Sequence, residues 1–432
     1  MLIQRKKLHY IYYIFIALIC ITAYSIFYLM GQDNYNIQGL IIFILSLLSM
    51  ICGIESMRKF GFKANNLFQI VYFFCLMLNT FNISALQKPK TIIDIYYFFT
   101  GAYIMVFFLY IGEKGYLSTK YKINIPKIFN SNNIIIGLLI VYYTGYIYKF
   151  SQTGIKLFSN TALRYLDDSI YVIPGVSGML NLICWILLMY LPNTNKINKA
   201  IIIPSIIIMS GILDFSRGNV MRICIFLLVD YILRKGKNIL NKKYIKKVLI
   251  ISTIIIMVFV GLGELRQKDS SNVFSISNIL YSKVNNEYFN WIYSYSAINF
   301  DVLKLTIDSN SFGYPTALLI PIIRIVSGSD TIISYYEVFA ERALNGFNAS
   351  TFLSPFVADG SLLYIIEIII FAILIGFIIG FTKKYNLRGV YIFIMTMLVL
   401  TVFGNYILNP NYLFSMVVAI ILLIFSSNNN KE

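Results

Sequence analysis

Apolar runs and short polar segments alternate along the whole chain. Runs of about 15 to 24 apolar residues are typical of helices that cross a membrane. They predict twelve such helices, which cover residues 9–31, 38–54, 67–82, 91–111, 133–150, 174–192, 200–213, 219–233, 248–263, 360–381, 389–407 and 412–426. We therefore expect an all-α polytopic membrane protein in which residues 1–432 form a single integral membrane domain.

The spacing of the runs is uneven in one place. Residues 264–357 separate the ninth run from the tenth, and a connection of that length is usually functional or carries structure of its own. We expect one long extracytoplasmic loop here, before the last three helices. The first run follows "MLIQRKK" and is longer than a signal-peptide core, so we expect it to remain as the first membrane helix.

Composition and charge agree with a membrane protein and exclude two other classes. Hydrophobic residues make up 58% of the chain and charged residues 13%, which leaves too little polar surface for a soluble domain. The net charge of +17 does not indicate a nucleic-acid binder, because the Lys and Arg residues lie in short clusters between the apolar runs. The densest cluster, "ILRKGKNILNKKYIKKV", is typical of a cytoplasmic loop, and the pattern predicts that both termini are cytoplasmic.

Cysteines and histidines add no cofactor chemistry. The cysteines all lie inside apolar runs, so their spacing predicts neither a disulfide framework nor a zinc site. The single histidine, His9, is expected at the cytoplasmic end of the first helix. A Ser-His-Asp or Cys-His site on the outer side is therefore excluded, and we expect no metal and no cofactor.

A charged turn interrupts two apolar runs in "GILDFSRGNV", residues 211–220. The flanking runs of about 14 and 15 residues give roughly 22 Å as helices, less than a hydrocarbon core of about 30 Å, so we expect a turn recessed below the outer surface. One interpretation is an Asp214 and Arg217 pair that acts as a structural latch. The other places Arg217, with Arg222 deeper in the helix, in an anion-binding cavity that opens outward.

A second group of polar residues begins the tenth run, in "NGFNASTFLSPFVADGSLLYIIE", residues 345–367. Asp359 either caps the N-terminus of the helix or has a functional role. Glu367 lies two turns deeper in an otherwise uncharged segment. An intramembrane carboxylate is a functional-site hypothesis, and a protonated Glu hydrogen-bonded to a neighbouring helix is the structural alternative.

Further cations are spread over the outer segments. Each one taken alone is best explained as a solvated loop charge, but together with Arg217 and Arg222 they make the outer side rich in cations. The further cations are Arg164, Arg266, Lys268, Lys283, Lys304, Arg324 and Arg342.

The order of these features resembles the Wzy-type polymerases, which join lipid-linked oligosaccharide repeat units into O-antigen or capsule. The resemblance rests on about a dozen expected spans, the "SRG" turn between two central helices, the long outer loop, and "NASTFLSPFVADG" leading into the next span. In that family the last stretch typically contains Asp-Phe-Gly, whereas here Gly360 follows Asp359 directly. The resemblance implies a GT-C-like architecture and a multi-pass protein of the bacterial cytoplasmic membrane with its active site facing outward.

The resemblance also implies a metal-independent glycosyl transfer between two polyprenyl-diphosphate-linked oligosaccharides, the donor and the acceptor. The partners would be these substrates, membrane lipid, and a chain-length regulator and flippase. Asp359, or in second place Asp214, would accept the proton of the acceptor hydroxyl. Fixed arginines would stabilise the leaving diphosphate, namely Arg217 and Arg222 with help from Arg164, Arg266, Arg324 or Arg342.

Three other functions are alternatives, and one of them, the O-antigen ligase, shares this architecture. A flippase for lipid-linked oligosaccharides should show two similar halves, and the chain has no detectable repeat. An O-antigen ligase relies on an outer histidine, and a membrane acyltransferase needs a histidine or a serine-based site. The chain has no histidine on the expected outer side, and its sequence does not place a serine-based site there.

Overall fold

The computed structural model describes residues 36–119, 128–158, 172–173, 175–214, 216–236, 241–267, 276–309, 317–319 and 349–426. Within these ranges the chain is helical, and an isolated bridge between Ser84 and Ser282 is the only β feature. The long helices are α2 (Ile37–Phe60), α3 (Ala64–Asn79), α4 (Ile92–Leu117), α5 (Ser131–Thr153), α7 (Val176–Tyr190), α8 (Lys196–Ile206) with the π-helix η4 (Ile207–Leu213), α9 (Arg217–Lys235), α10 (Lys242–Gln267), α17 (Ser361–Lys384), α18 (Arg388–Val399) and α19 (Pro410–Ser426).

Seven helices in the described ranges are long and apolar enough to cross a membrane, and three shorter ones are also apolar. A helix lies at every expected run except residues 9–31, which are outside the described residues. On α10, Leu249 is 62% exposed and Met257 is 63% exposed, as expected for a helix that faces lipid. The protein is therefore a multi-pass helical membrane protein.

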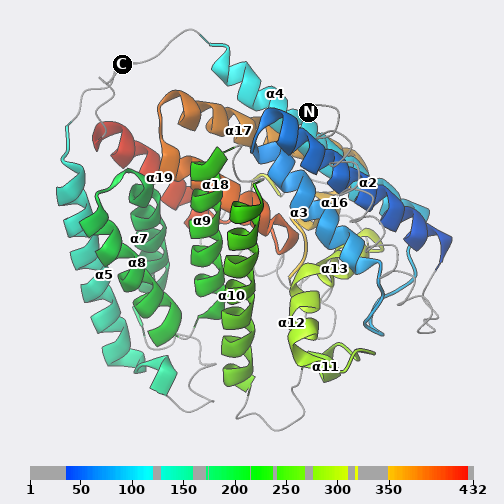
Figure 1. The fold of residues 1–432 in the computed structure, drawn as a ribbon, viewed down its shortest axis with the longest axis horizontal. Coiled ribbons are helices and arrows are strands. Elements are labelled where there is room, and N and C mark those ends of the chain that lie inside the picture. Colours follow the sequence, from blue (N-terminus) through cyan, green and yellow to red (C-terminus); the bar gives the residue numbers. More distant parts are fainter. Residues whose placement is uncertain are drawn as a thin grey trace.

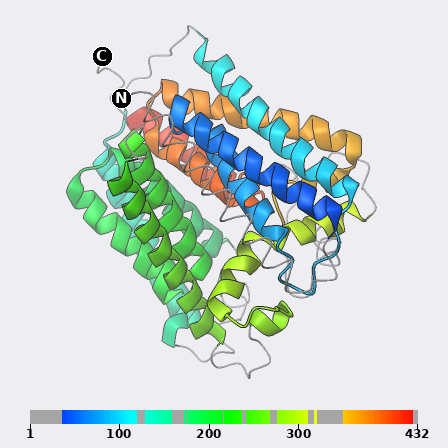
Figure 2. The same ribbon diagram turned by 45° about the vertical axis from the view of Figure 1, so that its right-hand side comes forward.

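The helices form two groups with α18 between them (Figures 1 and 2). One group contains α2, α3, α4 and α17, and the other contains α5 and α7 to α10. The central α18 contacts α3 and α17 on one side and α7 and α9 on the other, and α19 packs against α7. Residues of α18 are accordingly almost all buried, including Phe393 and Met395.

The closest helix pair, α4 and α17, runs parallel. At one end the Tyr364 hydroxyl donates to the backbone oxygen of Tyr97, and at the other end Lys383 pairs with Glu113 at 2.8 Å. Glycines let the two backbones meet, because a Cβ at Gly376 would lie 2.5 Å from the backbone oxygen of Leu109. Small residues are the usual means of close helix packing in membranes.

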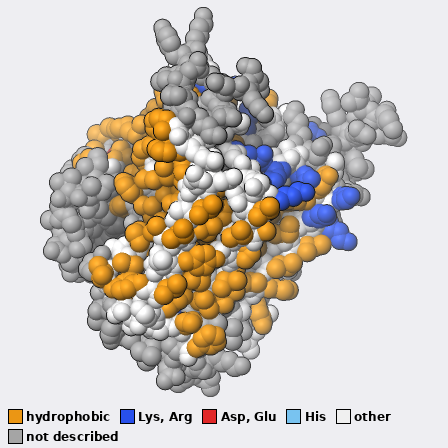
Figure 3. Space-filling view, turned by 90° about the vertical axis from the view of Figure 1, so that its left-hand side faces the viewer, with side chains coloured by type: hydrophobic (Ala, Val, Ile, Leu, Met, Phe, Trp, Pro, Cys, Tyr) orange, Lys and Arg blue, Asp and Glu red, His pale blue; other side chains and the backbone are white. Residues whose placement is uncertain are grey.

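The helix bundle has two opposite ends, at which successive helices are connected. At one of them, which we call the basic end, Asn132 at the start of α5 contacts Asn198 at the start of α8. At the same end, Asp230 near the end of α9 pairs with Arg388 at the start of α18. In Figure 3, hydrophobic side chains cover most of the visible described surface, and the Lys and Arg side chains gather at its upper right.

The opposite end, which we call the loop end, contains the turn after η4, the connection between α3 and α4, and four short helices. The short helices are α11 (Ile276–Ile279), α12 (Glu287–Ser296), α13 (Asn299–Ile307) and α16 (Ser354–Asp359). Three of them, α11, α12 and α13, lie within the expected outer loop, and α12 and α13 pack against α3, α4 and α10.

Candidate functional site

The charged turn closes a tight hairpin between η4 and α9. Pro204 lies inside α8 and lacks a backbone N–H, and the helix continues as a π-helix from Ile207, a distortion that often marks functional sites. A Cβ at Gly211 would lie 2.5 Å from Cγ2 of Val220, so only glycine permits this approach of η4 to α9. The backbone N–H of Ser216 donates to the oxygen of Gly211 at 2.9 Å and closes the turn.

The helices on both sides of the turn are longer than the apolar runs that predict them. The helical segment Lys196–Leu213 has 18 residues and α9 has 19. Each helix is therefore about 27 Å long, whereas the apolar runs alone predict about 22 Å. The additional turn comes from the polar flanks at the basic end, namely Lys196 and Lys199 on α8 and Arg234 and Lys235 on α9.

Asp214 has an ion-pair partner that the sequence interpretation left out. The ammonium of Lys149, near the end of α5, lies 2.8 Å from Oδ1 of Asp214, and both side chains are largely buried. The latch interpretation, which paired Asp214 with Arg217 alone, is therefore incomplete, because Lys149 supplies a positive charge from another helix. Arg217 begins α9, and its side chain lies outside the described residues.

Two buried tyrosines of α5 lie on the same helix as Lys149. Tyr142 and Tyr146 are buried one turn apart with ring centroids separated by 4.9 Å, and the Lys149 ammonium lies 5.9 Å from the Tyr146 ring. Tyr142 faces Ser210 of η4. The turn is thus bordered by hydroxyl groups on one side.

Arg222 lies deeper in α9, against two tyrosines from the C-terminal part of the chain. Its guanidinium carbon is 5.5 Å from the ring centroid of Tyr406 and 5.7 Å from that of Tyr412. Nε donates to the backbone oxygen of Gly218 at 3.1 Å. Such stacking stabilises the cation and leaves the remaining N–H groups available for an anion.

The charge of Arg222 is not neutralised by the part of the chain that the structure describes. No carboxylate there forms an ion pair with it. Tyr406 lies in the segment between α18 and α19, and its phenol is neutral near pH 7, so it supplies no counter-charge. A partly buried arginine that no described carboxylate neutralises is suited to an anionic ligand.

The second predicted group forms a separate cluster. Asp359 is fully buried at the end of α16, and its Oδ2 accepts a hydrogen bond of 2.7 Å from the backbone N–H of Ala317. The helix-cap interpretation is wrong, because the N-cap of α17 is Gly360 and no side chain caps that helix. Glu367 on α17 is 2% exposed and faces Asp359. These contacts differ from those of Arg222, so the predicted base and the predicted anion site lie in different clusters.

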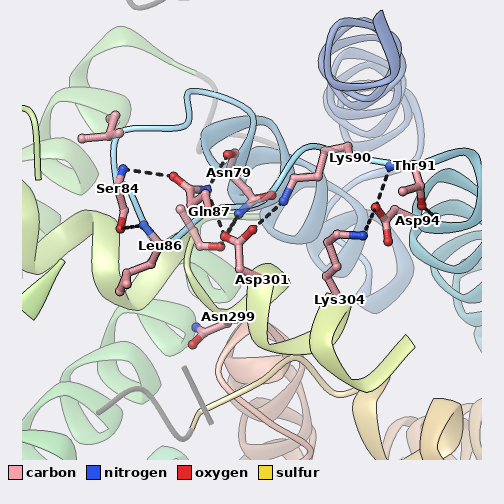
Figure 4. Close-up of polar contacts among 12 residues, drawn as sticks. Asn79, Ser84, Leu86, Gln87, Lys90, Thr91, Asp94, Asn299, Asp301 and Lys304 are labelled. Carbon is pink, nitrogen blue, oxygen red and sulfur yellow. Dashed lines mark hydrogen bonds and ion pairs between the residues drawn. The ribbon is translucent and has the colours of Figure 1, made fainter. Parts of the chain in front are cut away.

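A third cluster joins α13 to the connection between α3 and α4 (Figure 4). Asp301 accepts hydrogen bonds from Lys90 at 2.6 Å, from Asn79 at 2.6 Å and from Gln87 at 2.9 Å. The hydroxyl of Tyr293 on α12 donates to Gln87 at 2.6 Å. We call these residues the α13 clamp.

One turn further along α13, a second ion pair extends the clamp. The ammonium of Lys304 lies 3.0 Å from Oδ2 of Asp94, which also accepts the backbone N–H of Thr91 as part of a capping box at the start of α4. The prediction of a solvated loop charge is wrong for Lys304, because it is 4% exposed. Lys283, by contrast, is exposed as expected. The clamp is electrically balanced, so it serves to hold α13 rather than to bind an anion.

The remaining predicted arginines are not placed by the structure. Arg164, Arg324 and Arg342 lie outside the described residues, and Arg266 lies in the last turn of α10 with a side chain outside them. Within the described ranges, no group of three or more His, Cys, Asp or Glu residues is arranged to hold a metal ion.

Sequence reasoning missed Lys149, Tyr406 and Tyr412. Lys149 carried a usable signal, because it is the one charge in the run at residues 133–150 and intramembrane charges mark partners or sites. The two tyrosines carried none, since the chain has 34 tyrosines and their proximity to Arg222 depends on the packing of α19. No family model matches the chain, and no curated protein and no solved structure matches it.

Proposed function

We propose that the chain is a membrane glycosyltransferase that joins polyprenyl-diphosphate-linked oligosaccharide repeat units into a surface polysaccharide at the outer face of the cytoplasmic membrane. The observation that carries this proposal is the cation of Arg222, which no carboxylate of the described residues neutralises and which is stacked on Tyr406 and Tyr412 inside a helical membrane protein. A lipid diphosphate is an anion that reaches such a site from within the bilayer. The sequence resemblance to Wzy-type polymerases supports the same substrate class.

In the proposed reaction, a hydroxyl oxygen of the acceptor glycan attacks the anomeric carbon of the donor. The bond between that carbon and the diphosphate oxygen breaks, and the polyprenyl diphosphate leaves with the bonding electrons. Arg222 and Arg217 bind the diphosphate and stabilise its increasing negative charge. A donor already activated by a diphosphate requires no nucleotide.

The hydroxyl proton must pass to a base. Asp214 is better placed for this role than Asp359, because it lies on the same hairpin as Arg222, whereas Asp359 contacts Ala317 in another cluster. Lys149 holds Asp214 in place at 2.8 Å. The order of the two candidate bases proposed from sequence is therefore reversed.

The decisive experiment uses a strain that lacks this protein and a purified sample reconstituted in lipid vesicles. We expect the strain to display glycans of a single repeat unit, and the vesicles to elongate a synthetic polyprenyl-diphosphate oligosaccharide. A strain with no surface glycan at all would indicate a flippase instead. Polymer that accumulates on the lipid without transfer would indicate a ligase, and either result would refute the proposal.

A further inference from the structure

The carboxyl groups of Asp359 and Glu367 face each other inside the helical core. Asp359 is fully buried at the end of α16, and Glu367, two turns into α17, is 2% exposed. Neither carboxylate oxygen of Glu367 has a hydrogen-bond partner in the described part of the chain. Its carboxyl faces that of Asp359.

The elements packed around Glu367 bring no cation to it among the described residues. The side of α4 next to this part of α17 presents Tyr96 and Tyr97, and the Tyr364 hydroxyl donates to the backbone of Tyr97. On α13, the ammonium of Lys304 is directed at Asp94 and Asp308.

The ends of α17 and its partners do not supply a charge either. Lys383 pairs with Glu113 at the basic end, and Arg388 of α18 pairs with Asp230 there. From the short segment of residues 317–319, the backbone N–H of Ala317 donates to Asp359. Asp359 is therefore the one titratable group of the described residues that faces Glu367.

An ionised carboxylate in such a place is strongly unfavourable, because it has lost its water and has no hydrogen bond in exchange. A second negative charge on Asp359 would add repulsion, and two carboxyl groups this close titrate as a pair. A single proton removes both costs. It leaves one carboxylic acid beside one carboxylate.

We propose that Asp359 and Glu367 form one proton-binding site, held mainly by Glu367, and that the bound proton keeps residues 317–319 docked on α16. The dock is the hydrogen bond from the Ala317 N–H to Asp359. Loss of the proton to water leaves two negative charges in the pair. Their repulsion separates the two carboxyl groups, and the movement of Asp359 releases the N–H of Ala317. This site is independent of the proposed glycosyl transfer.

Infrared difference spectroscopy tests the proton directly on the purified full-length protein in nanodiscs. We expect a C=O stretching band of a buried carboxylic acid that is absent in Glu367→Gln and shifted in frequency in Asp359→Asn. Glu113→Gln is the matched control, since Glu113 is ion-paired with Lys383, and it should keep the band unchanged. Loss of the band on raising the pH identifies the proton. A wild-type protein without the band, or a Glu367→Gln variant that retains it, would overturn the proposal.

The dock is tested with Ala317→Cys in a background that lacks the five native cysteines. Labelling by a soluble thiol reagent, corrected for thiolate formation with a small reference thiol, should rise several-fold from low to high pH. In the same background with Glu367→Gln the labelling should be low at every pH, because the amide stays neutral. Equal pH dependence in both proteins would refute the release of Ala317. Neither readout requires glycosyl transfer, so failure of the proposed function would leave both interpretable.

Discussion

The ammonium of Lys90 lies 2.6 Å from Oδ1 of Asp301, with exposed side-chain fractions of 1% and 3%. Lys90 belongs to the connection between α3 and α4, and Asp301 belongs to α13, more than two hundred residues later in the chain. The pair therefore fixes the described part of the long loop onto the first helix group. A buried pair of this kind is costly to break, because the remaining charge has no water and no partner.

Replacement of one member should destabilise the protein far more than replacement of both. We expect Asp301→Asn to lower the free energy of unfolding by about 3 to 5 kcal/mol, since it leaves the Lys90 charge buried and unpaired. The double variant Lys90→Met with Asp301→Asn should recover more than half of the loss. Thermal unfolding in detergent measures both, with the exposed Lys283→Ala as a control that should not change. Equal losses in the single and double variants would show that the ion pair does not hold α13.

The proposed polymer synthesis should require the guanidinium group of Arg222 and not only its positive charge. We expect Arg222→Ala to reduce polymer synthesis by 10²-fold to 10³-fold, as on removal of one transition-state donor, and Arg222→Lys to be nearly as damaging. Polysaccharide length on gels and turnover in vesicles measure the effect. Arg58→Lys, on α2 beside Glu55, is the matched control and should be fully active. Normal polymer from Arg222→Lys would mean that a point charge suffices.

The parallel pair of α4 and α17 should tolerate no side chain at its closest contact. Gly376→Ala places a Cβ 2.5 Å from the backbone oxygen of Leu109, and overpacking of this kind costs about 1 to 3 kcal/mol. We expect a lower unfolding temperature and weaker membrane expression. Gly261→Ala on α10 meets nothing within 4 Å and should have no such effect. Identical behaviour of the two variants would contradict the close helix contact.

The two ends of the molecule should face opposite sides of the membrane. In a cysteine-free background, we expect Lys283→Cys at the loop end to react with an impermeant thiol reagent added to intact cells. Ser118→Cys, exposed just beyond α4 at the basic end, should react only after lysis. Labelling of both positions in intact cells, or the reverse pattern, would overturn the expected orientation.

The sequence alone determined the class of this protein. The length and apolarity of its runs leave no other way to bury the surface, so helices appear at each expected run that the structure describes. It also directed attention to Asp214, in a turn expected below the membrane surface, and to Glu367, inside an apolar run, because a charge within the membrane is costly. Run length, apolarity and an isolated charge are local properties of the sequence, so they can be recognised without any knowledge of the packing.

Only the tertiary structure decided which charges meet. The sequence predicted a solvated Lys304, yet the packing of α13 against α4 buries it beside Asp94. Asp214 forms an ion pair with Lys149 on another helix, and Arg222 stacks on Tyr406 and Tyr412 from the last part of the chain. Ion pairs and cation–π contacts depend on distances of a few ångströms between segments far apart in sequence, and neither run length nor spacing encodes those distances.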